Sequence, residues 1–319
     1  MVLGHDSLAS PAPPHTPALR GQWTVSGQAL EPSRQWYRLG AVSPLELKNA
    51  RLQAHYAVQW LARTARAVVP PRRDDSHMAL IWDHEVNGLV TQPMLVRDGP
   101  VRLALSFTAG GIALLGPGGA EGLLPLDAVT EGDVRDFLMA WAGRFEIDPA
   151  DLLQPMPYAM PRHPLAEGGC YGFSLDGEAV RELGRWFFNG FDALDNLAGR
   201  YGGRATTPIR VRVWPHHFDI GMLITLGEGG PAGAPVVGVG LSPGDDLFRE
   251  PYFYVTPFPS PGYGSTLPAV AAPAGWHTDR SYTGVVLRGG DAVRSPHPRG
   301  LVDAVLAPAI EGCIALVQS

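Results

Sequence analysis

Residues Ile81–Asn87 (IWDHEVN) are echoed by Val213–Asp219 (VWPHHFD), and this pair of stretches decides the expected fold. The first belongs to a run from Met78 to Val86 that alternates with period two, which indicates a strand with one buried face. Each stretch follows a long amphipathic segment, 43–68 in one case and 177–201 in the other. The repetition predicts two similar halves, each built as a helix, antiparallel strands and a second helix.

The predicted fold class is therefore α+β, in four segments. They are a Pro-rich N-terminal arm (1–35), a first half (36–148), a Pro/Gly-rich linker (149–176) and a second half (177–319). An ancient internal duplication with a pseudo-twofold axis would explain the echo. The alternative is that two buried strands merely share Trp and His.

Local signals support these elements. Ser43 as cap, Pro44 at the first helical position and Glu46 three residues after the cap predict a helix that ends before Pro70. Thr130 is expected to cap the last helix of the first half. The second half is expected to contain strands near 208–214, 217–226, 235–241, 252–256 and 283–287, and a helix near 300–317.

The composition excludes several classes of protein. The 319 residues are 45% hydrophobic and 18% charged, with a net charge of −6, so neither a disordered chain nor a generic nucleic-acid binder is expected. No apolar run approaches the ~18 residues of a membrane span. Cys170 and Cys313 have no metal-binding or redox spacing, and the N-terminal stretch is not a signal peptide. A cytoplasmic protein without membrane or nucleic-acid partners is expected.

Lys48 is the single lysine among 25 basic residues. Arginine stays charged, whereas a lysine amine can lose its proton, so Lys48 is a candidate catalytic residue. It precedes His55, a second candidate, by one to two helical turns. The alternative is a chance lysine on a solvated helix face.

Histidines offer the best functional signal. His217 and Asp219 are two residues apart on an expected strand and would share a face, as a catalytic acid–base pair or as metal ligands. A divalent metal is a candidate cofactor, because His is the commonest metal ligand. The candidate ligands are His77, His216, His217 and His277. Alternatively, each is a hydrogen-bonded core residue.

Aromatic residues near these histidines could line a ligand pocket. Tyr252, Tyr254 and Trp276 are candidate substrate-binding residues, and Glu250 adds a carboxylate just before the tyrosines. Gly240–Gly244 (GLSPG) matches the nucleophile-elbow pattern of hydrolases. Its proline lacks the backbone N–H that the oxyanion needs, so a turn is expected instead.

Several blocks of the chain resemble an uncharacterised bacterial family known as domain of unknown function 5996. The likeness covers about residues 36–317 and implies one fold shared across both halves, without implying an activity. The block containing Arg51 adds this residue to the candidate substrate-binding set. The blocks are ELK at 46–48, ARLQAH at 50–55, DDSH at 74–77, VWPHHFD at 213–219, GVGLSPGD at 238–245, EPYFYV at 250–255, WHT at 276–278 and TG at 283–284.

Three functions remain open from the sequence. The first is an enzyme that acts on a small organic molecule through a His/Asp cluster between the two halves, with or without a metal. The second is a non-catalytic small-ligand binding protein with an aromatic and Arg-lined pocket. The third is an interaction or scaffold protein, which would show a large exposed apolar patch.

Overall fold

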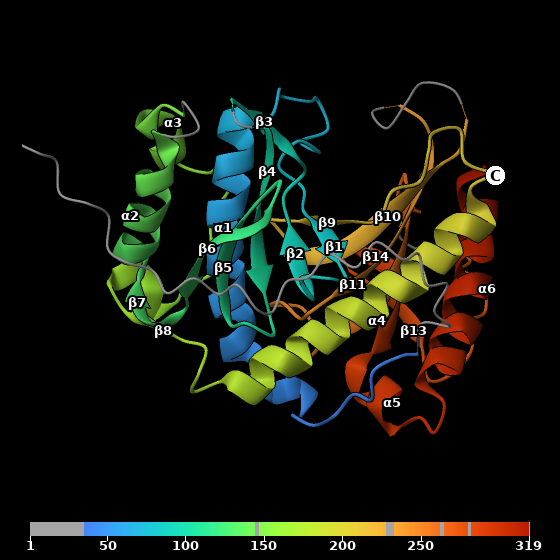
Figure 1. The fold of residues 1–319 in the computed structure, drawn as a ribbon. Helices are drawn as coiled ribbons and strands as arrows, with labels where there is room; N and C mark the ends of the chain where they lie inside the picture. Colours follow the sequence, from blue (N-terminus) through green and yellow to red (C-terminus); the bar gives the residue numbers. More distant parts are fainter. Residues whose placement is uncertain are drawn as a thin grey trace, which may run out of the picture.

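The computed structural model describes residues 35–97, 99–143, 147–227, 233–261, 265–279 and 282–318. The predicted arm (1–35) lies outside these ranges except for its last residue. The described chain combines long helices with antiparallel sheets (Figure 1), so the α+β prediction is confirmed.

The first half begins with a short 3₁₀ turn, η1 (Pro44–Glu46), and the long helix α1 (Lys48–Val68). A six-stranded antiparallel sheet follows, in the order β1-β2-β4-β5-β6 with β3 paired to β4. Its strands are β1 (Ile81–Asp83), β2 (Gly88–Val90), β3 (Met94–Val96), β4 (Gly99–Ser106), β5 (Gly111–Gly116) and β6 (Gly119–Pro125). Strand β7 (Asp127–Thr130) then leads into α2 (Glu131–Ala142), where Thr130 and Asp133 form the capping box that stabilises the helix start.

The second half begins with α4 (Gly177–Tyr201) and contains a second six-stranded antiparallel sheet in the order β13-β14-β12-β11-β10-β9. Helices α5 (Gly289–Arg294) and α6 (Pro298–Gln318) close the chain. The strands are β9 (Arg212–Trp214), β10 (Asp219–Thr225), β11 (Val236–Ser242), β12 (Tyr252–Phe258), β13 (Gly275–Thr278) and β14 (Thr283–Arg288).

Two local predictions need correction. Ser43 does not cap α1, because the chain first makes the 3₁₀ turn and the α-helix begins at Lys48. The strand predicted for Met78–Val86 covers only Ile81–Asp83, since Asp83 Oδ1 accepts hydrogen bonds from the backbone N–H groups of Glu85 and Val86 and bends the chain into a turn.

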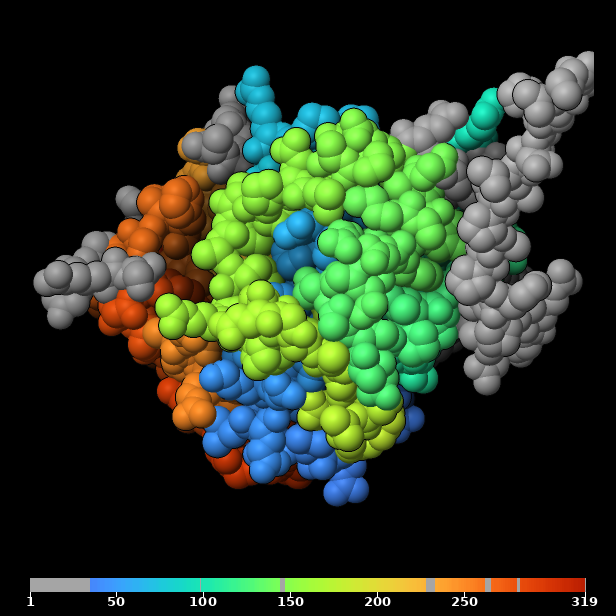
Figure 2. All heavy atoms as spheres, turned by 90° about the vertical axis from the view of Figure 1, so that its left-hand side faces the viewer, coloured from blue at the N-terminus to red at the C-terminus, as the bar shows by residue number. Residues whose placement is uncertain are grey.

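The predicted linker also has structure of its own. It contains α3 (Pro149–Leu153), η2 (Pro164–Glu167) and β8 (Cys170–Gly172), and β8 pairs with β7 of the first half. Figure 2 shows this segment in yellow-green, wrapped over the blue helix α1, which is visible in a hollow between it and α2. The segment therefore packs onto the first half and holds α1 in place.

The two sheets meet where the echoed stretches meet. Leu80 and Val213 form an antiparallel bridge, in which each backbone N–H donates to the other residue's carbonyl. Helix α4 crosses in front of the second sheet (Figure 1) and also contacts α1 and β1. One continuous apolar core results, with buried residues from both halves. The two halves therefore share one hydrophobic core instead of being connected only by a linker.

Helix α6 is, within the described ranges, the one helix long and apolar enough to cross a membrane by length and composition. The sequence contains no uninterrupted apolar run of that length, but the helix as a whole passes this weaker criterion. One face of α6, including Val302, Leu306 and Ile310, is buried in the core against β11 and β12. A core helix of this kind has the same composition.

Candidate functional site

The second sheet has one face covered by helices and one face open. Met222, Val239 and Val255 are neighbours in register and lie in the core beneath α4 and α6. On the opposite face the neighbouring row is Gly221, Gly240 and Tyr254. Two glycines side by side leave a depression on the open face.

The Tyr254 ring fills that depression. A Cβ placed on Gly240 would lie 2.4 Å from Cζ and from the hydroxyl oxygen of Tyr254, and one on Gly221 would lie 2.9 Å from the same oxygen. Real Cβ atoms do not approach so closely, so both positions require glycine for the ring to lie flat across β11 and β10. The ring therefore reaches the first residue of β10, which is Asp219.

Asp219 is a buried carboxylate, 9% exposed. The Tyr254 hydroxyl donates a hydrogen bond to its Oδ2, while its Oδ1 is buried and has no partner among the described residues. Burial raises the pKa of the Asp219 carboxyl, and the hydrogen bond from Tyr254 opposes part of this rise. A buried carboxylate oxygen without a hydrogen-bond partner lowers the stability of the folded protein. Such groups are a recognised mark of a functional site.

A pocket of about 460 Å³ opens over Asp219; we call it the outer pocket. Tyr252, Tyr254 and Tyr282 line it, and the Tyr282 hydroxyl is likewise buried without a partner in the described chain. Burial raises the pKa of all three tyrosine hydroxyls, so they remain protonated donors near neutral pH. Leu247 and Phe258 add exposed apolar surface at its edge. The outer pocket thus offers converging polar groups within an apolar rim, as expected of a site for an organic molecule.

The loop after β11 forms one wall. Ser242 Oγ accepts a hydrogen bond of 3.1 Å from the backbone N–H of Gly244, which has φ of +105°. Asp245 Oδ1 accepts from the backbone N–H groups of Leu247 and Phe248, both at 2.8 Å, and its Oδ2 accepts from the Tyr252 hydroxyl at 2.5 Å. The predicted turn is confirmed, because a bent loop follows Ser242 rather than the helix that a nucleophile elbow needs.

A second pocket, of about 550 Å³, adjoins the first; we call it the basic pocket. Lys48, Arg51 and His55 line it at helical spacing i, i+3 and i+7, so they share one face of α1. The predicted linker contributes Arg162 to the lining. His217 and Asp245 line both pockets, so the two pockets are adjacent.

His55 is held rigidly in this pocket. Its Nε2 lies 2.8 Å from the Pro215 carbonyl oxygen, which can only accept, so Nε2 carries the proton and Nδ1 the lone pair. The ring stacks on Phe218, with 5.1 Å between centroids. Burial lowers the pKa of His55 to about 4, with Arg51 adding to the effect, so the imidazole is neutral at pH 7.

His216 and His217 lie in the turn between β9 and β10, with ring centroids 4.2 Å apart. The expectation that His217 and Asp219 share a strand face is wrong, because β10 begins at Asp219 and the positive φ of Phe218 (+57°) ends the turn. The turn nevertheless brings His217 into the lining of both pockets. Burial and the neighbouring His217 lower the pKa of His216 to about 4.

Four predicted site residues lie outside both pockets. His77 Nδ1 accepts a hydrogen bond from the Arg72 backbone in a loop. Glu250 accepts one from the Gly290 backbone N–H at the start of α5. Trp276 pairs in register with Val285 on the helix-covered face and packs against the core, so it cannot line the outer pocket. His277 lies beside Asp279, 3.1 Å away.

The four predicted metal ligands are therefore not gathered. Of these, only His216 and His217 have rings in mutual contact, and the described ranges contain no group of three or more His, Cys, Asp or Glu that could jointly hold a metal ion. These residues do not fit a metal site built from the predicted histidines, since metal ions in proteins usually take at least three protein ligands.

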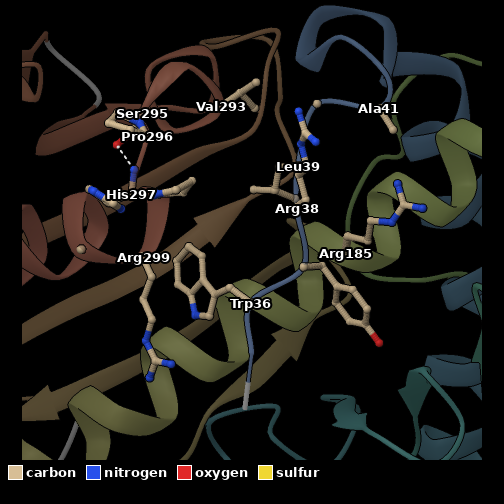
Figure 3. A pocket seen from close by; sticks show the side chains of 14 residues that line it. Trp36, Arg38, Leu39, Ala41, Arg185, Val293, Ser295, Pro296, His297 and Arg299 are labelled. Atoms are coloured by element: carbon tan, nitrogen blue, oxygen red, sulfur yellow. Dashed lines mark hydrogen bonds between the residues drawn. The ribbon is translucent and has the colours of Figure 1, made fainter. Parts of the chain in front are cut away.

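A larger cleft, about 1250 Å³, lies elsewhere (Figure 3). It is formed by residues 36–41 of an extended segment against α4, the end of α5, the loop 295–297 and the start of α6. Figure 3 shows Arg38, Arg185 and Arg299 among the lining residues, each on a different element. Arg185 pairs with Glu178 and Glu182, and Arg299 pairs with Asp192, so their charges are already balanced within the protein. We therefore place the candidate site at the outer and basic pockets.

The sequence reasoning missed Ser242, Asp245 and Tyr282. A usable signal existed in the alternating glycines Gly238 and Gly240, which mark one strand face without side chains. No model of a known protein family, no curated protein sequence and no solved structure matches this chain. The resemblance to domain of unknown function 5996 thus stays an expectation that depends on the quoted blocks.

Proposed function

We propose that the protein is an enzyme that transfers a proton to or from a small organic molecule in the outer pocket. The observation that carries the proposal is Asp219: a buried carboxylate with Oδ2 bonded to Tyr254 and with Oδ1 unpartnered among the described residues. Because burial raises the pKa of Asp219, it can exchange a proton closer to neutral pH than an ordinary carboxylate.

The remaining groups of the pocket have supporting roles in this proposal. Tyr254 holds the Asp219 carboxylate in one orientation. The unpartnered Tyr282 hydroxyl is a donor for a substrate oxygen, and the His217 ring, which also lines the pocket, can hydrogen-bond the substrate. The proton leaves or enters the substrate at Asp219 Oδ1. A positioned general base of this kind typically contributes ~10²–10⁴-fold to the rate.

The test is proton exchange in D₂O. The protein is incubated with a panel of 2-oxo acids, hydroxy acids, aldoses and amino acids, and ¹H NMR follows loss of individual C–H signals. We expect exchange with at least one compound, reduced ~10²-fold or more in Asp219→Asn. Asp136→Asn, which changes an exposed aspartate on α2, is the matched control and should behave as the wild type. Proton exchange in Asp219→Asn at the wild-type rate would contradict the proposal.

A non-catalytic ligand-binding protein is the second candidate. The observation in its favour is that three of the lining groups are tyrosines whose hydroxyls stay protonated, which is recognition chemistry rather than reactive chemistry. A compound from the panel that raises the melting temperature but shows no exchange would favour this function.

We also infer that the two halves arose by duplication. Four-residue turns join β1 to β2 and β9 to β10, and each ends on a non-glycine residue with positive φ, Asn87 (+47°) and Phe218 (+57°), although these two residues are one position out of step with the sequence echo, which aligns Asn87 with Asp219. The Leu80–Val213 bridge joins the two equivalent regions antiparallel, as a twofold axis would require. Superposition of the two sheets on these turns tests the idea; strands that diverge beyond the first hairpin would contradict it.

We further propose a cytoplasmic location. Cys170 and Cys313 are both free thiols, as is usual for proteins of reducing compartments. Cell fractionation with an antibody against the native chain tests this, and recovery in the membrane or secreted fraction would contradict it.

A further inference from the structure

The basic pocket is built around a buried cation. Arg51 is 6% exposed, and its Nη1 is buried with no hydrogen-bond partner in the described chain. Burial lowers the pKa of Arg51, with Asp245 and Asp246 opposing the effect, but an arginine remains charged at neutral pH. A buried N–H group of a cation that lacks a hydrogen-bond partner is costly, so the Nη1 atom of Arg51 is incompletely satisfied as it stands.

The backbone is shaped to admit this side chain. Gly244 has φ of +105°, and a Cβ placed there would lie 2.4 Å from Arg51 Nη1. Any other residue at position 244 would displace the guanidinium. The loop that carries Asp245 into the outer pocket therefore also accommodates Arg51 in the basic pocket.

Other positive charges converge on the same space. Lys48 and Arg162 line the basic pocket, are exposed, and make no ion pair within the described ranges. Lys48 and Arg51 lie in the first turn of α1, where the helix dipole adds positive potential. His55 and His216 remain neutral at pH 7, because burial lowers both pKa values to about 4.

Two carboxylates, Asp245 and Asp246, also line this pocket and offset part of the positive charge. Both oxygens of Asp245 already accept hydrogen bonds, from backbone N–H groups and from Tyr252. Asp246 is exposed to solvent. Three cations against these two acids leave the basic pocket net positive.

We propose that the basic pocket binds the anionic group, a carboxylate or a phosphate, of a small molecule whose reacting part lies in the outer pocket. Arg51 is the central ligand of this anion, with Lys48 and Arg162 on its exposed side. His217 and Asp245 line both pockets, so one molecule can span them. The identity of the molecule as a substrate rests on the proposed function, whereas the anion site does not.

The test is isothermal titration calorimetry of the full chain with inorganic phosphate and, separately, with malonate. We expect one of the two to bind in the millimolar range or tighter, and its identity to distinguish phosphate from carboxylate. Arg51→Gln should weaken that binding at least tenfold, and higher salt should weaken it further. If Arg51→Gln does not fold, the double variant Lys48→Gln with Arg162→Gln, at two exposed positions, should lose at least tenfold.

Two variants make the result specific. Arg38→Gln removes an exposed arginine that lines the larger cleft and should bind the anion as the wild type does. Asp219→Asn should lose proton exchange but keep anion binding. Anion binding without any exchange would thus keep this site while removing the proposed catalysis. The proposal is overturned if neither anion binds, if Arg51→Gln and the double variant bind normally, or if Arg38→Gln alone abolishes binding.

Discussion

The Tyr254 hydroxyl donates a hydrogen bond to Asp219 Oδ2 across an intervening strand. Tyr254 lies on β12 and Asp219 on β10, and β11 separates them. Only glycine at position 240 leaves room for the ring to cross that strand. The relationship therefore links a backbone requirement in the sheet to the protonation and orientation of the candidate catalytic carboxylate.

Replacing Gly240 with alanine should break this link. The new Cβ would lie 2.4 Å from the Tyr254 ring and 2.7 Å from the Ile220 carbonyl oxygen, so the ring must move off Asp219. We expect Gly240→Ala to lower the free energy of unfolding by about 1–3 kcal/mol, the usual cost of overpacking, and to reduce proton exchange. Urea denaturation and the D₂O assay measure the two effects.

Gly275→Ala is the matched control for this prediction. Gly275 lies on β13 of the same sheet, and a Cβ there meets no described atom within 4 Å. This variant should unfold and exchange protons like the wild type. If the two alanine variants behave alike, the close packing of Tyr254 against Gly240 affects neither stability nor proton exchange.

Much of the fold could be predicted, because helices and strands leave periodic patterns. The second-half helix 177–201 matches α4, and the predicted strands overlap β9 to β12 and β14. Boundaries failed where side chains compete with the backbone ladder. Asp83 ends its strand by binding two backbone N–H groups, which period-two alternation does not reveal.

The candidate site was also predicted only in part, because periodicity reveals which residues share a helix face but not which strands pair. Lys48 and His55 meet in one pocket because helical spacing places them on one face of α1. Asp219 and Tyr254 meet only because strands distant in sequence pair in register, and pairing partners cannot be read from one sequence. Trp276 was placed on the wrong face, because the sequence alone does not show which face of an edge strand the helices cover.

Asp219→Asn should stabilise the protein near neutral pH. The folded-state pKa of Asp219 is raised, so its stabilising contribution is complete below the ordinary value of 3.8 and is lost as pH rises through the folded pKa. Asparagine cannot ionise, so the variant avoids this loss of stability. Its side-chain oxygen still accepts the hydrogen bond from the Tyr254 hydroxyl. We expect an increase of order 1 kcal/mol in unfolding free energy at pH 7, typical when a functional strain is removed.

The pH dependence is the decisive part of this prediction. The difference between Asp219→Asn and the wild type should shrink as pH falls and disappear below about 3.8. Urea titrations at several pH values provide the measurement. A variant that is less stable than the wild type at pH 7 would show that the ionised Asp219 carboxylate stabilises the fold instead of destabilising it.

His55 should make the fold sensitive to acid. Its pKa falls from 6.5 to about 4 on folding, so its contribution is fully present above 6.5 and is lost as pH falls through about 4. That difference corresponds to up to about 3 kcal/mol. His55→Gln keeps a donor for the Pro215 carbonyl but cannot titrate. Between pH 6.5 and 4 the variant should lose less stability than the wild type, and parallel curves would contradict the assignment.

Asn189 should hold the extended segment 35–41 against α4. Its side chain is fully buried, its Oδ1 accepts from the Tyr37 backbone N–H, and its Nδ2 donates to the Tyr37 carbonyl, both at 2.9 Å. Asn189→Ala leaves both backbone groups of Tyr37 unsatisfied, at a cost of about 2–3 kcal/mol. We expect faster amide exchange at residues 36–40 in hydrogen–deuterium mass spectrometry.

Asn196→Ala serves as the control on the same helix. Asn196 is exposed and, among the described residues, bonds only to the Asp192 carbonyl one turn earlier, so its removal should change neither stability nor exchange at residues 36–40. Proton exchange at Asp219 should be unaffected in both variants, because the segment lines the larger cleft and not the outer pocket. A loss of activity in Asn189→Ala without loss of stability would instead couple that cleft to the site.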